Sequence, residues 1–111
     1  MNTRKFSKAQ ELDVANKLNG RVQPNSGATH FQKGDVKTKN ALIECKTTIT
    51  PKQSFSIKKE WLIKNKREAM QMGKKYSILA FNFGPKHEMY YVLDEMTFLE
   101  LFENLSQDFY E

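Results

Sequence analysis

Two short runs of alternating side chains, residues 35–38 and 41–47, are separated by only two residues, Lys39 and Asn40. Alternation of this kind is typical of β-strands with one buried face, and a two-residue separation favours a β-hairpin. Because a tight turn fixes the register of its strands, this hairpin decides which side chains in the middle of the chain lie opposite one another.

The predicted register pairs Asp35 with Glu44 on one face of the hairpin, and Lys46 follows on the same face. The opposite face receives the side chains of Val36, Ile43 and Cys45. Two carboxylates about 5 Å apart repel by about 3 kcal/mol at an effective dielectric constant near 20, so a cation such as Mg²⁺ is expected between them. The alternative is a solvated polar face on which Lys46 pairs with Glu44 and no metal binds.

A first helix is predicted for residues 8–19, because Ser7 and Gln10 have the spacing of a capping box and Gly20 suits the position after a helix end. On this helix Glu11 lies at the centre of an apolar arc. The arc is formed by Val14, Ala15 and Leu18. A carboxylate on an inward face needs a partner, since an unpaired buried charge is costly. That partner is either a lysine or a metal ion shared with the acids of the hairpin.

The remaining patterns predict an α/β (α+β) fold with elements in the order αβββαβ, a mixed central sheet flanked by helices, and a C-terminal helix. Residues 20–33 are rich in turn formers and are expected to form a loop with a short strand near residues 28–31. Beyond the hairpin we expect a helix at residues 56–72 that is stopped by Gly73, and strands at residues 76–83 and 88–93. A last helix is expected to follow, capped by Asp94. The inner stripe of the second helix is expected to contain Ile57, Trp61, Leu62, Ala69 and Met72, with no base stacking by the tryptophan.

The length of 111 residues predicts a single domain, residues 1–111. No stretch approaches the roughly 18 apolar residues that cross a bilayer, and no signal segment begins the chain, so we expect a cytoplasmic protein, in the host cytoplasm if it is viral. Cys45 alone supports neither an internal disulfide nor a thiolate zinc site and is assigned to the core. No motif includes His30 or His87, which are expected at the surface.

Charge is distributed unevenly along the chain. Residues 1–75 contain 17 Lys and Arg against six Asp and Glu, whereas residues 76–111 contain one basic residue against seven acidic ones. This asymmetry predicts a basic face for a polyanion and an acidic face opposite to it. The basic side chains are concentrated around the second helix, at Lys52, Lys58, Lys59, Lys64, Lys66, Arg67, Lys74 and Lys75. They could neutralise several DNA phosphates, although a solvated helix face would have the same composition.

The hairpin carries a short pattern that resembles the core motif of the PD-(D/E)XK nuclease superfamily. In this pattern an acid, Asp35, is followed after eight residues by a second acid, Glu44. A lysine, Lys46, stands two positions after Glu44. Gly34 stands where the family has proline, and the connection between the acids is short. With Glu11 and the Ser26-Gly27 turn, the chain resembles more narrowly the Holliday junction resolvases of archaeal and phage type, over residues 7–83.

This resemblance implies a restriction-endonuclease-like core and a Mg²⁺-dependent DNA endonuclease, with Mn²⁺ as a substitute ion. By the resemblance, the metal would be held by Asp35, Glu44 and the backbone carbonyl of Cys45. Lys46 would orient the attacking water or stabilise the transition state, and Glu11 would complete the acidic cluster directly or through water. DNA would be contacted by Ser26, Lys58, Lys59, Lys64, Lys66 and Arg67.

The implied substrate is a four-way DNA junction. Cutting its two symmetric strands requires two equivalent active sites, which implies a twofold homodimer. Nine of the 13 aromatic residues lie within residues 76–111, more than one small domain is expected to hide, which also suggests a subunit interface. Two alternatives remain open: another nuclease of the superfamily, acting on flaps, nicks or restriction-type sites, and a DNA-binding module without catalysis.

Overall fold

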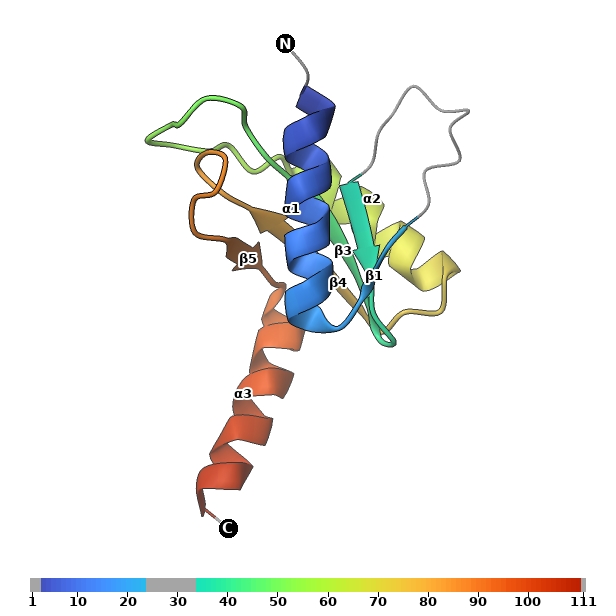
Figure 1. Cartoon of the computed structure of the whole chain (residues 1–111). Coiled ribbons are helices and arrows are strands. Elements are labelled where there is room, and N and C mark those ends of the chain that lie inside the picture. The colour runs from blue at the N-terminus through green and yellow to red at the C-terminus, as the bar shows by residue number, and fades with distance from the viewer. Residues whose placement is uncertain (1–2, 24–33, 111) are drawn as a thin grey trace.

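The computed structural model describes residues 3–23 and 34–110, which form a small α+β fold with a five-stranded mixed sheet and three helices (Figure 1). The elements are α1 (Thr3–Leu18), β1 (Arg21–Val22), β2 (Gly34–Lys37), β3 (Ala41–Lys46), α2 (Lys59–Gln71), β4 (Tyr76–Phe81), β5 (Tyr90–Val92) and α3 (Glu95–Tyr110). The strands lie in chain order, with β3 and β4 parallel and the other neighbours antiparallel. The predicted mixed sheet is therefore confirmed.

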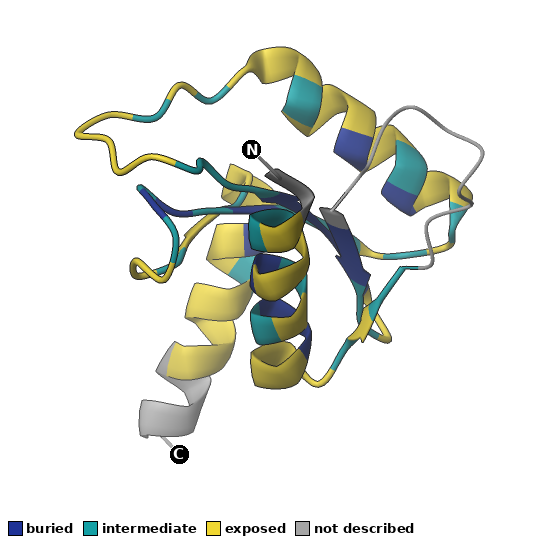
Figure 2. Ribbon diagram, turned by 45° about the horizontal axis from the view of Figure 1, so that its top comes forward, coloured by how far each residue is buried: buried dark blue, intermediate teal, exposed yellow. Residues whose placement is uncertain are grey.

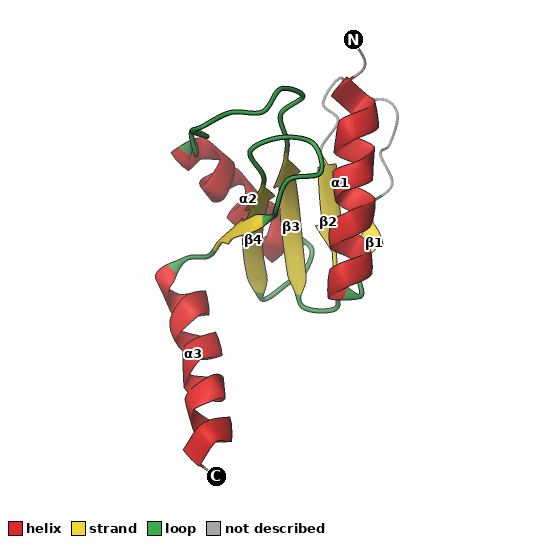
Figure 3. Ribbon diagram, turned by 60° about the vertical axis from the view of Figure 1, so that its left-hand side comes forward, coloured by secondary structure: helices red, strands yellow, loops and turns green. Residues whose placement is uncertain are grey.

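The helices form layers on the two faces of this sheet. α1 lies on one face and α2 on the other, while α3 extends away from the sheet (Figures 1 and 3). α2 connects the parallel strands β3 and β4, as a crossover between parallel strands requires. Among the described residues, no helix combines the length and the hydropathy of a membrane-spanning segment.

The hairpin of β2 and β3 has the predicted register, with Asp35 opposite Glu44. Its turn lies at Lys39 and Asn40, where the hydroxyl of Thr38 accepts hydrogen bonds from the backbone amides of Asn40 and Ala41, at 3.3 and 3.0 Å. The Thr38 amide in turn donates to the Ala41 carbonyl at 2.9 Å. The side-chain hydroxyl thus stabilises a turn whose two central residues are otherwise weak turn formers.

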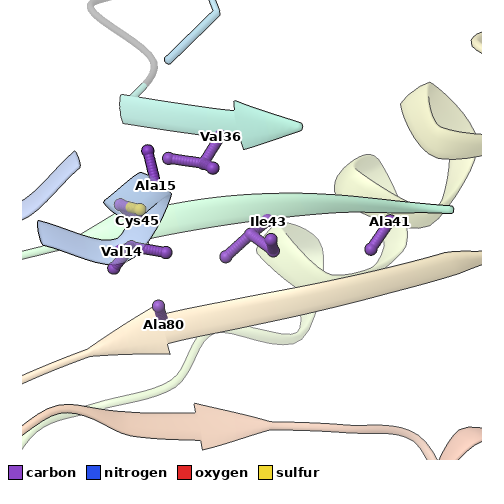
Figure 4. Close-up of a cluster of buried hydrophobic side chains, with 7 residues drawn as sticks. All are labelled: Val14, Ala15, Val36, Ala41, Ile43, Cys45 and Ala80. Atoms are coloured by element: carbon purple, nitrogen blue, oxygen red, sulfur yellow. The ribbon is translucent and has the colours of Figure 1, made fainter. Parts of the chain in front are cut away.

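An aliphatic cluster fills the space between α1 and the sheet (Figure 4). Its buried members are Val14, Ala15, Val36, Ala41, Ile43, Cys45 and Ala80. Val36, Ile43 and Cys45 point to this face as the alternation predicted, and the assignment of Cys45 to the core is confirmed.

The boundaries of α1 differ from those predicted. The helix begins at Thr3 rather than residue 8, so Ser7 lies inside it and is not a cap. At its other end Asn19 adopts the left-handed conformation, with φ of 56°, that was expected of Gly20. Gly20 follows, and its amide donates to the Ala15 carbonyl at 2.8 Å. Glycine is needed there because a Cβ atom would lie 2.8 Å from the Lys37 carbonyl oxygen.

The second helix begins at Lys59, later than predicted, and ends before Gly73, whose φ of 70° confirms the predicted stop. Its inward residues are Asn65 and Ala69, both buried. Leu62, expected on the inner stripe, is 36% exposed. β4 and β5 are shorter than expected, and the strand expected near residues 28–31 lies outside the described residues.

The acidic part of the chain does not lie opposite the basic part. Asp94, the residue before α3, has an oxygen 3.8 Å from the Lys66 ammonium on α2. Within α3, the Glu100 carboxylate lies 2.6 Å from the Lys75 ammonium and accepts a hydrogen bond from the Tyr76 hydroxyl at 2.8 Å. The two charge regions therefore meet at the junction of α2, β4 and α3, and the expectation of opposite faces is wrong.

Candidate active site

Two buried carboxylates face each other across β2 and β3. Asp35 and Glu44 are directly paired in the register and are only 3% and 6% exposed. They lie on the face of the sheet that α2 covers, because their neighbours Val36, Ile43 and Cys45 belong to the cluster under α1. The solvated face of the alternative is therefore wrong for these two acids, whereas the pairing of Lys46 with Glu44 that it predicted is confirmed.

Lys46 completes this group at the end of β3. Its ammonium lies 3.2 Å from the Glu44 carboxylate, and its side chain is 32% exposed while that of Glu44 is 7% exposed. The same ammonium lies 4.3 Å from the centre of the Trp61 ring, in a cation–π contact. Two contacts thus hold one cation at the boundary between the buried acids and solvent.

Glu11 approaches the same part of β3 from the other side of the sheet. It is half-buried on α1, next to the buried Val14 and Ala15, whereas Leu18, the third residue of the predicted inward arc, is 39% exposed. Its charge acts on the thiol of Cys45, as do the charges of Asp35 and Glu44. Burial and these three carboxylates raise the pKa of the Cys45 thiol, which makes the thiol an inert core group rather than a nucleophile.

The donor set of the site suits a hard divalent cation. Within residues 3–23 and 34–110, no three His, Cys, Asp or Glu side chains are close enough to hold a metal ion together. Asp35 and Glu44 are thus a carboxylate pair, and Mg²⁺ is commonly held by one or two carboxylates together with water and substrate phosphates. The buried pair fits that requirement, and the share of Glu11 in it stays a prediction.

The basic residues predicted to bind DNA divide into two groups. Lys58 lies beside the site, with its ammonium 5.6 Å from the centre of the Trp61 ring. The others lie exposed on α2, at Lys59, Lys64, Lys66 and Arg67. Ser26 lies outside the described residues.

Two residues of α2 were missed or misassigned from sequence. Trp61, expected in the core, is half-buried and contacts Lys46 and Lys58. Asn65 is 2% exposed, and its amide donates to the carbonyls of Leu42 and Ile78, at 3.2 and 3.1 Å. The detectable signal was helical spacing, because Trp61, Asn65 and Ala69 follow one another at intervals of four.

Comparisons of the chain with protein-family models, with curated proteins and with solved structures found no match in any of the three. The functional assignment therefore depends on the residues and geometry of the site itself.

Proposed function

We propose that this protein is a metal-dependent DNA endonuclease that hydrolyses phosphodiester bonds in branched DNA, with the four-way Holliday junction as its leading substrate. The observation that carries the proposal is the buried pair of Asp35 and Glu44 with the Lys46 ammonium 3.2 Å from Glu44. A protein that only binds a polyanion has no use for two buried acids beside its basic surface, because they would repel the ligand.

The metal proposed for this site is Mg²⁺, with Mn²⁺ as a substitute, held by Asp35, Glu44 and the Cys45 backbone carbonyl. A divalent ion bound there would polarise the scissile phosphate and lower the pKa of a bound water. Glu11 lies on the α1 side of the sheet, and among the described residues no three acids are close enough to hold a metal together, so it is assigned a supporting position that acts through water.

Lys46 has a role that needs no metal. Its ammonium is held by Glu44 and by the Trp61 ring, so it is oriented before substrate binds. Placed beside a phosphate, such a fixed cation stabilises the negative charge that grows on the phosphate oxygens in the transition state. The partly desolvated position strengthens this interaction relative to bulk water.

The fold and the surface agree with this assignment. A restriction-endonuclease-like core is part of the proposal, supported by the helix, the acid-bearing hairpin, the crossover helix and the parallel strand that follow in that order. The exposed cations of α2 form a track for the DNA backbone, which predicts strongly salt-dependent binding.

The experiment that tests the function is cleavage of a labelled four-way junction in Mg²⁺ or Mn²⁺, beside a linear duplex and a flap of equal length. We expect paired symmetric cuts in the junction, and loss of cutting with retained binding in Asp35→Asn and Lys46→Ala. Lys17→Ala, which removes an exposed lysine from α1, is the control and is expected to cut normally. Cutting of the flap or duplex alone would replace the resolvase by another nuclease, and binding without any cutting would leave only a DNA-binding module.

A twofold homodimer is part of the proposal, because two equivalent sites are needed for paired cuts. α3 offers apolar side chains for such an interface, and its described part is mostly exposed (Figure 2). Met96 is 78% exposed, Phe102 56% and Leu105 58%, which is unusual for a helix of a monomer. Light scattering of the purified protein should give twice the mass of one chain, and Phe102→Glu should halve it. A monomer with and without junction DNA would contradict the resolvase assignment and leave the nuclease assignment intact.

A further inference from the structure

An aromatic row begins at the candidate site and crosses the sheet on the same face. In the register Lys46 of β3 lies beside Phe81 of β4, and Phe81 lies beside Tyr90 of β5. Neighbours in a sheet share a face, so this row runs along the sheet from the site lysine towards its β5 edge.

The rings of the row contact one another in sequence. Phe81 stacks on Phe55 with a centroid distance of 5.0 Å and on Tyr90 with a distance of 5.7 Å. Phe83 packs edge-on against both Phe81 and Tyr90 at 5.4 and 5.5 Å. Trp61, which carries the Lys46 and Lys58 contacts, lies 6.3 Å from Phe55. The row is therefore continuous from the cation beside Glu44 to Tyr90.

The row ends at an exposed ring and is bordered by cations. Tyr90 is 44% exposed, whereas Phe55, Phe81 and Phe83 are half-buried and hold its ring in place. Lys46 and Lys58 lie at the Trp61 end of the row, with their ammonium groups 4.3 and 5.6 Å from the centre of that ring. Exposed aromatic surface next to two lysines favours a ligand with flat rings and negative charge, and this combination is typical of sites for single-stranded nucleic acid.

We propose that this aromatic row binds an unpaired nucleotide of a DNA strand, with its base stacked on Tyr90 and its phosphates along the lysines that border the row. Strand spacing of about 4.8 Å places Tyr90 about 10 Å from Lys46, since β5 is two strands from β3. A stacked strand advances about 3.4 Å per nucleotide, so the stacked base lies within about three nucleotides of a phosphate at Lys46. This inference rests on the proposed function, and it adds that the preferred substrate has unpaired bases beside the cut.

Binding without metal separates this inference from the nuclease chemistry. The probes are a labelled blunt DNA duplex and the same duplex with a short unpaired thymidine tail, titrated in EDTA and followed by fluorescence anisotropy. We expect the tail to raise affinity about tenfold in the wild-type protein, within the range of one base–aromatic stack. Tyr90→Leu should remove this preference while Tyr90→Phe keeps it, because the ring and not the hydroxyl makes the stack.

The matched control is Tyr91→Leu. Tyr91 is the next residue of β5, is 40% exposed and lies on the opposite face, where it pairs with Ala80 of the aliphatic cluster. It should keep the tail preference. The inference would be overturned if Tyr90→Leu preferred tailed DNA as strongly as the wild type, which is also the result expected if the row docks a protein. It would equally be overturned if Tyr90→Leu and Tyr91→Leu lost the preference for tailed DNA to the same extent.

The two proposals fail separately. A protein that prefers tailed DNA through Tyr90 but cuts no DNA in Mg²⁺ or Mn²⁺ would keep the aromatic site and lose the nuclease. A protein that cuts junctions equally well with Tyr90→Leu, and shows no tail preference in EDTA, would keep the nuclease and lose the aromatic site.

Discussion

The two faces of the sheet are formed by alternate residues of the same strands, and their side chains differ in chemistry. Under α1, alternate residues of β2, β3 and β4 form an aliphatic cluster that includes Val36, Ile43 and Ala80. Under α2, the intervening residues include the buried acids Asp35 and Glu44 beside the fully buried Leu42 and Leu79. Because successive side chains of a strand point to opposite faces, Val36 and Ile43, which lie next to the two acids in sequence, hold the sheet against α1.

This difference shows how a small domain can remain folded with two buried carboxylates. Two like charges on one face weaken the fold, and apolar side chains buried on both faces compensate, Ile43 under α1 and Leu42 and Leu79 under α2. Mutation of the acids should therefore change activity, whereas mutation of the buried apolar residues should change stability. The following predictions test that separation, beginning with the largest expected effect.

On the polar face, Glu44→Gln should lower the cleavage rate by about 1,000-fold or more, a change of about 4 kcal/mol in the barrier. The protein should remain folded, with a melting temperature close to that of the wild type, because the substitution removes both the repulsion from Asp35 and the attraction to Lys46. Rates are measured on the labelled junction and stability by thermal unfolding. Glu60→Gln, at an exposed position of α2, is the control and should change neither quantity. A large loss of stability in Glu44→Gln would show that the acid pair is structural.

On the aliphatic face, Ile43→Ala should lower the free energy of unfolding by about 3 kcal/mol, because Ile43 is completely buried and its truncation leaves a cavity. The folded fraction that remains should cut DNA at the wild-type rate. Urea unfolding gives the free energy, and rates are normalised to the folded fraction. Ile63→Ala, at a residue that is 48% exposed on α2, should stay within about 0.5 kcal/mol of the wild type. Similar losses in both variants would contradict the description of the core.

The hairpin was predictable because its information is local. The two-residue turn and the alternation of side chains fix the register, and the register brings Asp35 and Glu44 together without any knowledge of the rest of the fold. The stop at Gly73 and the cap at Asp94 were equally local, since each depends on one residue type at one helix end.

The rest depended on tertiary contacts that no local pattern contains. The start of α1 was misplaced because Ser7 suits a cap, yet the helix continues through it to Thr3. Trp61 was assigned to the core because an aromatic residue at helical spacing usually packs inward, whereas here its ring meets two lysines. The row that ends at Tyr90 joins residues from a connector and two strands, so only the assembled sheet brings them together.

Asn65 is a buried polar residue on the same face of the sheet as the two acids, but its contacts are structural. Its side-chain amide donates to the carbonyls of Leu42 on β3 and Ile78 on β4, so its removal leaves two buried acceptors without this donor. We expect Asn65→Ala to lower the free energy of unfolding by about 2 kcal/mol, whereas Glu44→Gln should leave stability close to that of the wild type. Urea unfolding measures this free energy, with Asn16→Ala as the control. Asn16 is exposed on α1, so its substitution should change the free energy of unfolding little. Unchanged stability in Asn65→Ala would mean that these hydrogen bonds do not hold β3 to β4.

The smallest effect is expected at Asp94, where the polar face meets α3. Its carboxylate accepts a hydrogen bond from the Thr97 amide at 2.8 Å, and this bond, with a minor contribution from Lys66, lowers the pKa of Asp94 below its usual 3.8. Asp94→Ala should cost about 1 kcal/mol at neutral pH, the usual value of an N-cap. Because the folded pKa is below the unfolded one, the ionised cap contributes fully to stability above about pH 4, and this contribution is lost as the pH falls further.

The control variant Asp94→Asn keeps a capping oxygen without a charge. Its stability should follow that of the wild type at neutral pH and lack the wild-type decline in acid. Equal pH dependence in wild type and Asp94→Asn would show that the charge of Asp94 does not stabilise the start of α3.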